Sequence, residues 1–207
     1  MHENIKDISN LYPEWKVYIY HGDIDLEPFQ SYTNVVLIKV KITQHHWIRL
    51  ERFTPIDNSD VSVMIVRDAD SRINVRDQWC IEQFLESPLK FHVIRDHPYH
   101  AWFILAGLWG IKKGCIPHFS FRRAIDIYIE NSSKNDGAAL DQFFLKDVIY
   151  PKIKSISLAH GRFTLSGENP AIPIPLEHNG IFCGQIIEYS ADGTTYVDQE
   201  HCRLLLQ

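Results

Sequence analysis

The pair Asp68-Ala69-Asp70 is the feature of this sequence with the clearest chemical use. It directly follows residues 61–66, a continuous apolar run typical of a strand buried on both faces. Ligands of open α/β sheets bind at the carboxyl ends of the strands, so the pair is expected at a binding edge. Two carboxylates in one loop can share Mn²⁺ or Mg²⁺, which in turn binds the oxygens of a substrate diphosphate. The same pair is also compatible with a solvated loop or a helix N-cap.

A second polar cluster, Arg-Asp-His-Pro-Tyr-His at residues 95–100, follows the next expected strand, at 91–94. Arg95 could pair with a phosphate or with one of the two aspartates, and His97 could donate to a diphosphate or a sugar hydroxyl. The alternative is a salt-bridged turn whose histidines are satisfied by backbone groups.

Glycines flank an aromatic residue in the segment Gly107-Leu108-Trp109-Gly110. Such a tryptophan can present its ring face to a sugar, and Gly107 would let the backbone lie close beside it. The alternative interpretation is a helix C-cap with Trp109 in the core.

Two further residues are candidates on position alone. Asp141 stands near the start of an expected helix, where it could act as the general base for an acceptor hydroxyl or serve only as a partner of the helix dipole. His160 follows the expected strand at 154–159 and could complete a metal shell with Asp68 and Asp70. A lone histidine at a strand end can equally be structural.

The elements that must position these residues alternate between strand and helix, which predicts an α/β fold with a mainly parallel sheet flanked by helices, in a single domain over residues 1–207. The expected strands are residues 15–20, 35–42, 61–66, 91–94 and 154–159. The expected helices are residues 2–12, 46–53, 72–86 with Ser71 as N-cap, 101–109, 121–130 and 138–149.

Composition narrows the function classes. The chain has 207 residues, of which 45% are hydrophobic, and a net charge of −5. That charge does not favour nucleic-acid binding, which needs clustered Lys and Arg. The longest apolar run, 101–111, is about half of the roughly 20 residues that span a bilayer, so no membrane span is expected. Four distant cysteines and the absence of a secretory signal favour a cytoplasmic protein with free thiols.

Several of these segments together resemble a known family. The residues Arg67-Asp68-Ala69-Asp70-Ser71-Arg72, Arg76-Asp77, the run FHVIRDHPYH at 91–100 and GLWGIKKG at 107–114 are similar to GT-A type glycosyltransferases of bacteria and large viruses. Among these are the chlorella-virus enzymes that help to build the capsid-protein glycan, which would place this chain in a virus-infected host cell. The resemblance covers about residues 15–145.

The resemblance implies a nucleotide-sugar donor, with Mn²⁺ or Mg²⁺ as cofactor. Asp70 would be the direct metal ligand and Asp68 would contact the ribose or the metal. Arg67, Arg95 and His97 would lie around the diphosphate and sugar, and Asp141 or Asp96 would activate the acceptor. Domains of this type begin with a strand that holds the nucleobase, whereas this sequence opens in the following helix. Either that strand lies outside the sequence or the nucleotide is held differently.

The function expected from the sequence is therefore transfer of a sugar from a nucleotide-sugar donor, with a UDP-sugar favoured, to a hydroxyl of a glycan or glycoprotein. Two alternatives stand beside it. One is a carbohydrate-binding module without catalysis, which would explain an aromatic content of 12%. The other is a phosphatase or phosphotransferase that uses the acidic pair, although such sites usually carry Thr or Val where Ser71-Arg72 stand here.

Overall fold

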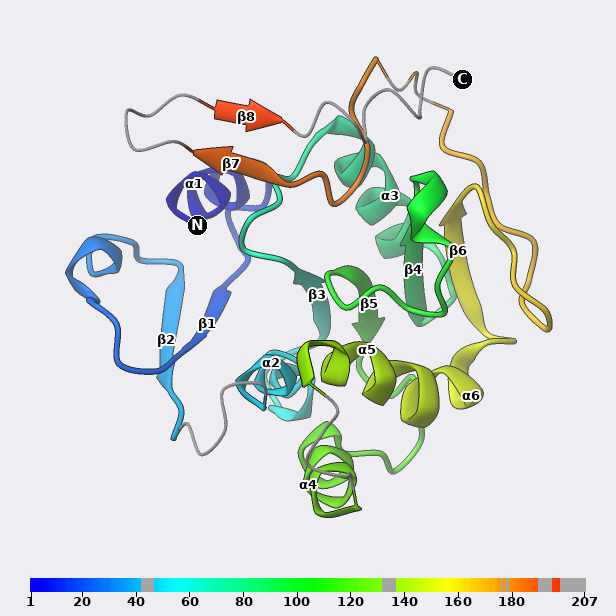
Figure 1. The fold of residues 1–207 in the computed structure, drawn as a ribbon, viewed down its shortest axis with the longest axis horizontal. Helices are drawn as coiled ribbons and strands as arrows, with labels where there is room; N and C mark the ends of the chain where they lie inside the picture. Colours follow the sequence, from blue (N-terminus) through cyan, green and yellow to red (C-terminus); the bar gives the residue numbers. More distant parts are fainter. Residues whose placement is uncertain (42–46, 132–136, 176, 178, 190–194, 198–207) are drawn as a thin grey trace.

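The computed structural model describes residues 1–41, 47–131, 137–175, 177, 179–189 and 195–197. Its centre is a four-stranded sheet of β3 (Val63–Arg67), β4 (Phe91–Arg95), β5 (Leu108–Lys112) and β6 (Ser157–Gly161), in the order β3-β5-β4-β6 (Figure 1). The expected strands at 61–66, 91–94 and 154–159 correspond to β3, β4 and β6. The chain is thus an α/β protein, as predicted.

The sheet is mixed, so the expectation of a mainly parallel sheet is wrong. β5 lies between β3 and β4 and is antiparallel to both, while β4 and β6 are parallel. The error comes from residues 101–109, which were expected to form a helix: residues 101–107 are turns and irregular chain, and residues 108–109 begin β5. A strand covered on both faces is apolar at every position, so its sequence carries no period that separates it from a buried helix.

Two smaller sheets accompany the central one. β1 (Val17–His21) and β2 (Val35–Lys39) form a parallel pair in which Val17 lies opposite Val35, and β7 (Ile187–Tyr189) pairs antiparallel with β8 (Thr195–Val197). The expected strands at 15–20 and 35–42 correspond to β1 and β2. Ile42 and His46, each at the end of an expected element, lie outside the described residues.

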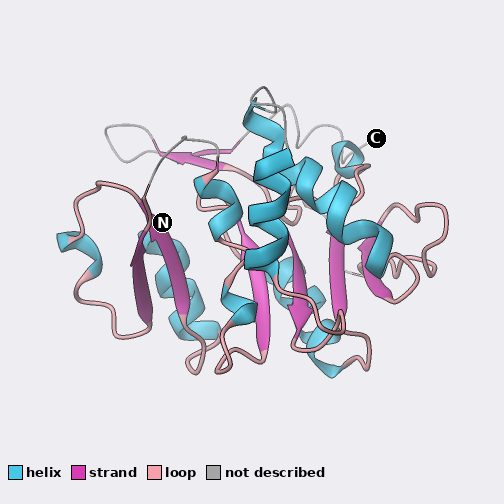
Figure 2. Cartoon of the chain, turned by 90° about the horizontal axis from the view of Figure 1, so that it is seen from below, coloured by secondary structure: helices cyan, strands magenta, loops and turns pink. Residues whose placement is uncertain are grey.

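Helices cover both faces of the central sheet (Figures 1 and 2). One face carries α2 (Ile48–Glu51), α4 (Phe121–Asn131), α5 (Leu140–Phe144) and α6 (Tyr150–Ile153), whose apolar side chains share a core with Trp109. The other face carries α3 (Val75–Glu86), where Cys80 packs with Ile94 and Cys183. Burial of these two apolar interfaces is the main stabilising term of the fold.

The remaining elements are short or peripheral. Helix α1 (His2–Leu11) packs beside the turn that follows β3 and reaches it through Asn4, whose side-chain amide donates to the carbonyls of Ala69 and Ser71. In the part of the chain that the structure describes, 3₁₀ turns at Glu27–Phe29, Pro55–Asp57, Pro98–His100 and Gly137–Ala139 join the larger elements. No helix among the described residues is long and apolar enough to cross a membrane.

Three local expectations are corrected. The N-cap of α3 is Asn74 rather than Ser71, because Asn74 Oδ1 accepts from the amides of Arg76 at 2.9 Å and Asp77 at 3.2 Å. The helix expected at 138–149 runs on to Ile153 through a π-helical segment, Leu145–Ile149, and this wider turn precedes Pro151 in α6. Finally, β3 is only half covered: Met64 and Val66 are buried, whereas its other residues are partly exposed.

Candidate functional site

The turn after β3 presents its two aspartates to solvent. Asp68, Ala69 and Asp70 are all exposed, and half of the Asp68 side chain is accessible. Their backbone is nonetheless fixed. The carbonyl of Asp68 accepts from Ser71 Oγ at 3.2 Å, and that of Asp70 accepts from the amide of Ile187 at 2.9 Å. The structure therefore places two carboxylates on a held backbone at the carboxyl end of β3, an edge strand of the four-stranded sheet.

Arg52 connects this turn to Asp141. Its guanidinium donates from Nη1 to Asp68 Oδ1 at 2.5 Å and from Nη2 to Asp141 Oδ2 at 2.8 Å. Arg52 directly follows α2, which packs against α5, and α5 carries Asp141 in its first turn. Two predicted site residues that are 73 positions apart in the sequence, 68 and 141, are thus held within one guanidinium of each other.

Gly107 is the third predicted residue at this place. A Cβ at Gly107 would lie 2.1 Å from Asp68 Oδ2 and 2.4 Å from its Cγ, closer than such atoms approach. Only glycine leaves room for the Asp68 carboxylate in the observed position. The role that the sequence suggested for Gly107, close approach of the backbone to a ligand, is filled here by an aspartate of the chain itself.

Arg67 points from the end of β3 toward α3. Its Nη2 lies 3.2 Å from Asp77 Oδ1, and its Nη1 donates to the carbonyl of Val66 at 2.9 Å. Asp77 is fully buried, and neither of its carboxylate oxygens accepts a hydrogen bond from the described residues. Burial raises the pKa of Asp77 to about 6, against the opposing effect of Arg67. Arg67 is therefore engaged with a buried acid beneath the turn.

Arg95 lies in the interior rather than at the sheet edge. It forms a paired ion contact with Glu168 at 2.8 and 2.7 Å, and its Nε donates to the carbonyl of Trp102 at 2.7 Å. Its other donors reach the carbonyls of Phe103 and Phe163. This network ties two loops to β4 and leaves the guanidinium 1% exposed, so Arg95 does not reach a diphosphate in this conformation.

Asp96 and His97 are also buried. Asp96 accepts from Arg76 at 2.7 and 2.5 Å and from the amide of Cys183 at 3.0 Å, which joins α3, β4 and the C-terminal segment. His97 caps the 3₁₀ turn Pro98–His100 by accepting from the amide of Tyr99 at 3.1 Å, and its ring packs on Phe182. These contacts match the alternative of a salt-bridged turn, and we place neither residue in the proposed site.

Trp109 and His160 belong to the core. Trp109 is fully buried, stacks on Phe91 at 5.3 Å and donates from Nε1 to the carbonyl of Ala106, so its ring is not available to a sugar. His160 lies in β6 with its Nδ1 2.8 Å from His92 Nε2 and its ring edge against Trp79. Burial lowers the pKa of His160 to about 4, as expected for a neutral ring in an apolar place.

The residues that could hold a metal are therefore Asp68 and Asp70. Within the described part of the chain, no group of three or more His, Cys, Asp or Glu side chains is arranged to hold a metal ion, and His160 does not join the two aspartates. Two exposed carboxylates do suit Mg²⁺ or Mn²⁺, which commonly take one or two protein carboxylates and complete their shell with water and substrate phosphates. Asp68 and Asp70 could therefore hold a cation whose remaining ligands are water or phosphate oxygens.

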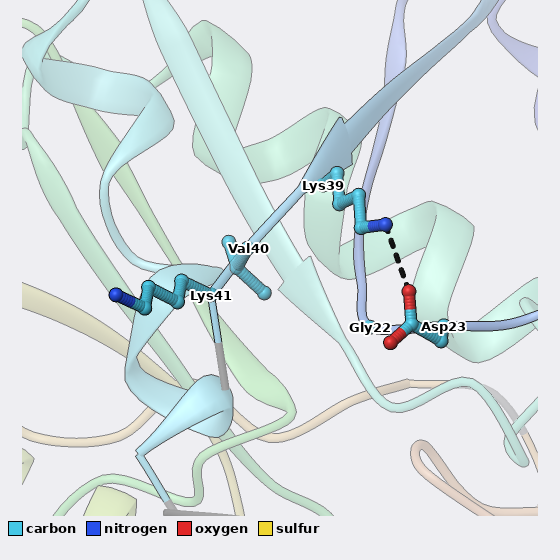
Figure 3. Close-up of a pocket in the computed structure, with 5 residues that line it drawn as sticks. All are labelled: Gly22, Asp23, Lys39, Val40 and Lys41. Carbon is cyan, nitrogen blue, oxygen red and sulfur yellow. Dashed lines mark ion pairs between the residues drawn. The ribbon is translucent and has the colours of Figure 1, made fainter. Parts of the chain in front are cut away.

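A separate hollow of about 480 Å³ lies at the ends of β1 and β2 (Figure 3). It is lined by Gly22, Asp23, Lys39, Val40 and Lys41. Lys39 is paired with Asp23 at 2.8 Å, and both side chains are largely exposed. None of the residues predicted for the site lines this hollow, and its one ion pair gives it no distinct chemistry.

Sequence reasoning missed Arg52. The residue lies 16 positions before Asp68 and 89 before Asp141, in a segment with three other basic or aromatic residues close by. No spacing rule links an arginine to carboxylates at such distances, so only the packing of α2 on α5 reveals it.

No protein-family model and no curated protein sequence matches this chain. Among solved structures, it is similar to a glycosyltransferase involved in the glycosylation of the major capsid of PBCV-1. The similarity has a TM-score of 0.45 and 15% sequence identity, and covers 73% of this chain and 85% of that one. This is the kind of protein that the sequence motifs resemble. At these values the likeness decides neither the activity nor the site residues, which have to be argued from the geometry.

Proposed function

We propose that this protein is a metal-dependent glycosyltransferase that moves a sugar from a nucleotide-sugar donor, with a UDP-sugar favoured, to a hydroxyl of a glycan or glycoprotein. One observation carries the proposal. Two exposed aspartates stand at the carboxyl end of β3, and the guanidinium of Arg52 bridges one of them, Asp68, to Asp141. Such a transfer needs a metal site that stabilises the leaving group and a base that takes the proton of the acceptor hydroxyl. A carboxylate pair can form the first, and a separate carboxylate can serve as the second.

In this mechanism Asp68 and Asp70 would hold Mn²⁺ or Mg²⁺, which supplies Lewis-acid stabilisation to the departing nucleoside diphosphate. Asp141 would take the proton from the incoming acceptor hydroxyl. Its side chain is 7% exposed and keeps its position through Arg52 and through the amide of Gln142, which donates to Asp141 Oδ1 at 2.9 Å. Such fixed placement of a base is what an acid–base step requires.

The buried candidate residues have structural contacts outside this site. Arg67 and its partner Asp77 anchor the end of β3 to α3, while Arg95 and Asp96 brace the loops around β4. The ion pair of Arg67 with Asp77 holds the residue directly before the acidic turn, and Arg95 and Asp96 direct their donors and acceptors to other groups of the protein.

The test is a thermal-shift screen of UDP, GDP, dTDP and their sugar conjugates, each with Mn²⁺ and with a chelator. A ligand that binds the folded state raises the melting temperature by mass action. We expect one nucleotide to stabilise the protein only when Mn²⁺ is present, and Asp70→Ala to lose that shift while keeping the melting temperature of the free protein. Stabilisation by glycans alone, indifferent to metal, would instead favour the carbohydrate-binding module.

A further inference from the structure

Arg52 holds a position that a cation would otherwise take. Among the described residues, its guanidinium is the positive group that forms ion pairs with both Asp68 and Asp141. The two bonds differ in setting. The Asp68 side chain is 50% exposed, whereas the Asp141 side chain is 7% exposed. Exposed ion pairs are weak and easily exchanged, and a pair with a buried carboxylate is harder to break.

Little else restrains this guanidinium. It lies over the ring of Phe53, with Arg52 Cζ 5.4 Å from the ring centroid. Its Nε is buried and donates to no acceptor among the described residues. Arg95, by contrast, directs its donors to several carbonyls as well as to Glu168. Arg52 can therefore part from one carboxylate without dismantling a network.

We propose that Arg52 is a built-in competitor for the metal, so that a divalent cation binding at Asp68 displaces Nη1 of Arg52 while the bond from Nη2 to Asp141 remains. This inference rests on the proposed role of Asp68 as a metal ligand. A carboxylate oxygen has two acceptor positions, and a charge-assisted hydrogen bond at 2.5 Å takes one of them on Asp68 Oδ1, so a cation that approaches this oxygen competes with Nη1. A guanidinium and a divalent cation a few ångströms apart also repel each other.

Arg52 then acts as a positioning residue for both halves of the site. Without metal, it holds the Asp68 carboxylate in a defined place and offsets the negative charge of the turn. With metal, it stays on Asp141 alone. Binding of the cation to Asp68 thereby changes the environment of Asp141 through the side chain of Arg52. This coupling needs no direct contact between the two aspartates.

The experiment measures the affinity of the full chain for Mn²⁺ alone, by electron paramagnetic resonance of the free ion and by calorimetry. The variants are Arg52→Gln and Arg52→Lys. Loss of an exposed pair worth up to about 1 kcal/mol corresponds to Mn²⁺ binding up to roughly fivefold tighter in Arg52→Gln. A lysine ammonium keeps the positive charge but lacks the planar fork that spans the two carboxylates, so Arg52→Lys is expected between wild type and Arg52→Gln. It also carries the test if Arg52→Gln does not fold.

The matched control is Arg122→Gln. Arg122 pairs with Glu51 and Asp126, so its loss changes the net charge equally without touching the acidic turn. Mn²⁺ affinity in that variant should equal that of the wild type. Affinity in Arg52→Gln that is equal to or weaker than wild type, or Mn²⁺ binding in neither protein, would overturn the competition.

Turnover of a sugar nucleotide is measured separately, which keeps the two claims apart. Tighter Mn²⁺ binding in Arg52→Gln together with no nucleotide binding or turnover in the wild type would sustain the competition and refute the transferase. Metal-dependent turnover with unchanged Mn²⁺ affinity in Arg52→Gln would do the reverse.

Discussion

Replacement of Gly107 by alanine should damage the acidic site while leaving the fold intact. The added methyl would stand 2.1 Å from Asp68 Oδ2, and contacts become ordinary only from 3.4 Å, so the carboxylate has to retreat by about 1.3 Å. The aspartate can do so at little cost, because half of its side chain faces solvent. Its bond to Arg52 is a partly exposed pair, so we expect a loss of less than about 1 kcal/mol in the free energy of unfolding.

The effect on function should be larger than the effect on stability. A shift of about 1 Å in a positioned group can lower a rate by on the order of 100-fold. Loss of the contacts that orient a metal-binding side chain typically lowers metal affinity by roughly 10- to 100-fold. Calorimetry of Mn²⁺ with the favoured nucleotide, alongside urea unfolding, measures both quantities on the same sample. Unchanged affinity for the metal–nucleotide pair in Gly107→Ala would refute the argument that Asp68 must lie where the structure has it.

Gly110 lies three residues after Gly107, within β5, and supplies the contrasting control. A Cβ there would meet the Ile65 Cδ1 at 2.6 Å and the carbonyl of Met64 at 3.2 Å, both away from the acidic turn. Overpacking of this kind costs about 1–3 kcal/mol. Gly110→Ala should therefore lower stability and leave the binding of the folded protein unchanged, which is the opposite of the pattern expected for Gly107→Ala.

Three further predictions concern Asp141, Asp77 and Glu168. Asp141→Asn should spare donor binding and slow transfer by roughly 100- to 10,000-fold, measured as nucleotide release under saturating donor. Asp77 has a folded pKa of about 6 against an ordinary 3.8, so its contribution to stability is present below pH 4 and is lost as the pH rises through 6. The stability of wild type minus that of Asp77→Asn, from urea unfolding, should thus fall by about 2 kcal/mol from pH 4 to pH 7; a flat difference would contradict the raised pKa. Glu168→Gln, which strands the buried Arg95, should cost about 3–5 kcal/mol, whereas Arg122→Gln at an exposed pair should cost under about 1 kcal/mol.

Local sequence patterns were sufficient to predict most elements. The apolar run before Asp68 marks β3, the helix expected at 72–86 is α3 although it begins at Val75 with Asn74 as N-cap, and β6 lies within three residues of the strand expected at 154–159. What failed was β5. Trp109 and Ile111 face one helical layer while Leu108 faces the other, so the segment is apolar throughout and its sequence does not distinguish strand from helix.

The arrangement of the candidate residues could be read from the sequence only in part, for a related reason. Exposure of Asp68 and Asp70 follows from their place at a strand end, which sequence can suggest. Burial of Arg95 could not be read locally, because the residue that neutralises it, Glu168, is 73 positions away. The same holds for Arg52, whose partners are set by how α2 rests on α5. Long-range ion pairs decide which charged residues remain available for ligands, and they are a property of packing.

The central claim, that the turn after β3 serves a nucleotide-sugar transferase, is tested most directly by release of nucleoside diphosphate from labelled sugar donors, with Mn²⁺ and with a chelator. The account predicts release from one donor class that requires the metal, that disappears in Asp70→Ala, and that is strongly slowed in Asp141→Asn although the donor still binds. Release that is indifferent to chelator and to both substitutions, or no donor binding by a folded protein with any nucleotide, would contradict it.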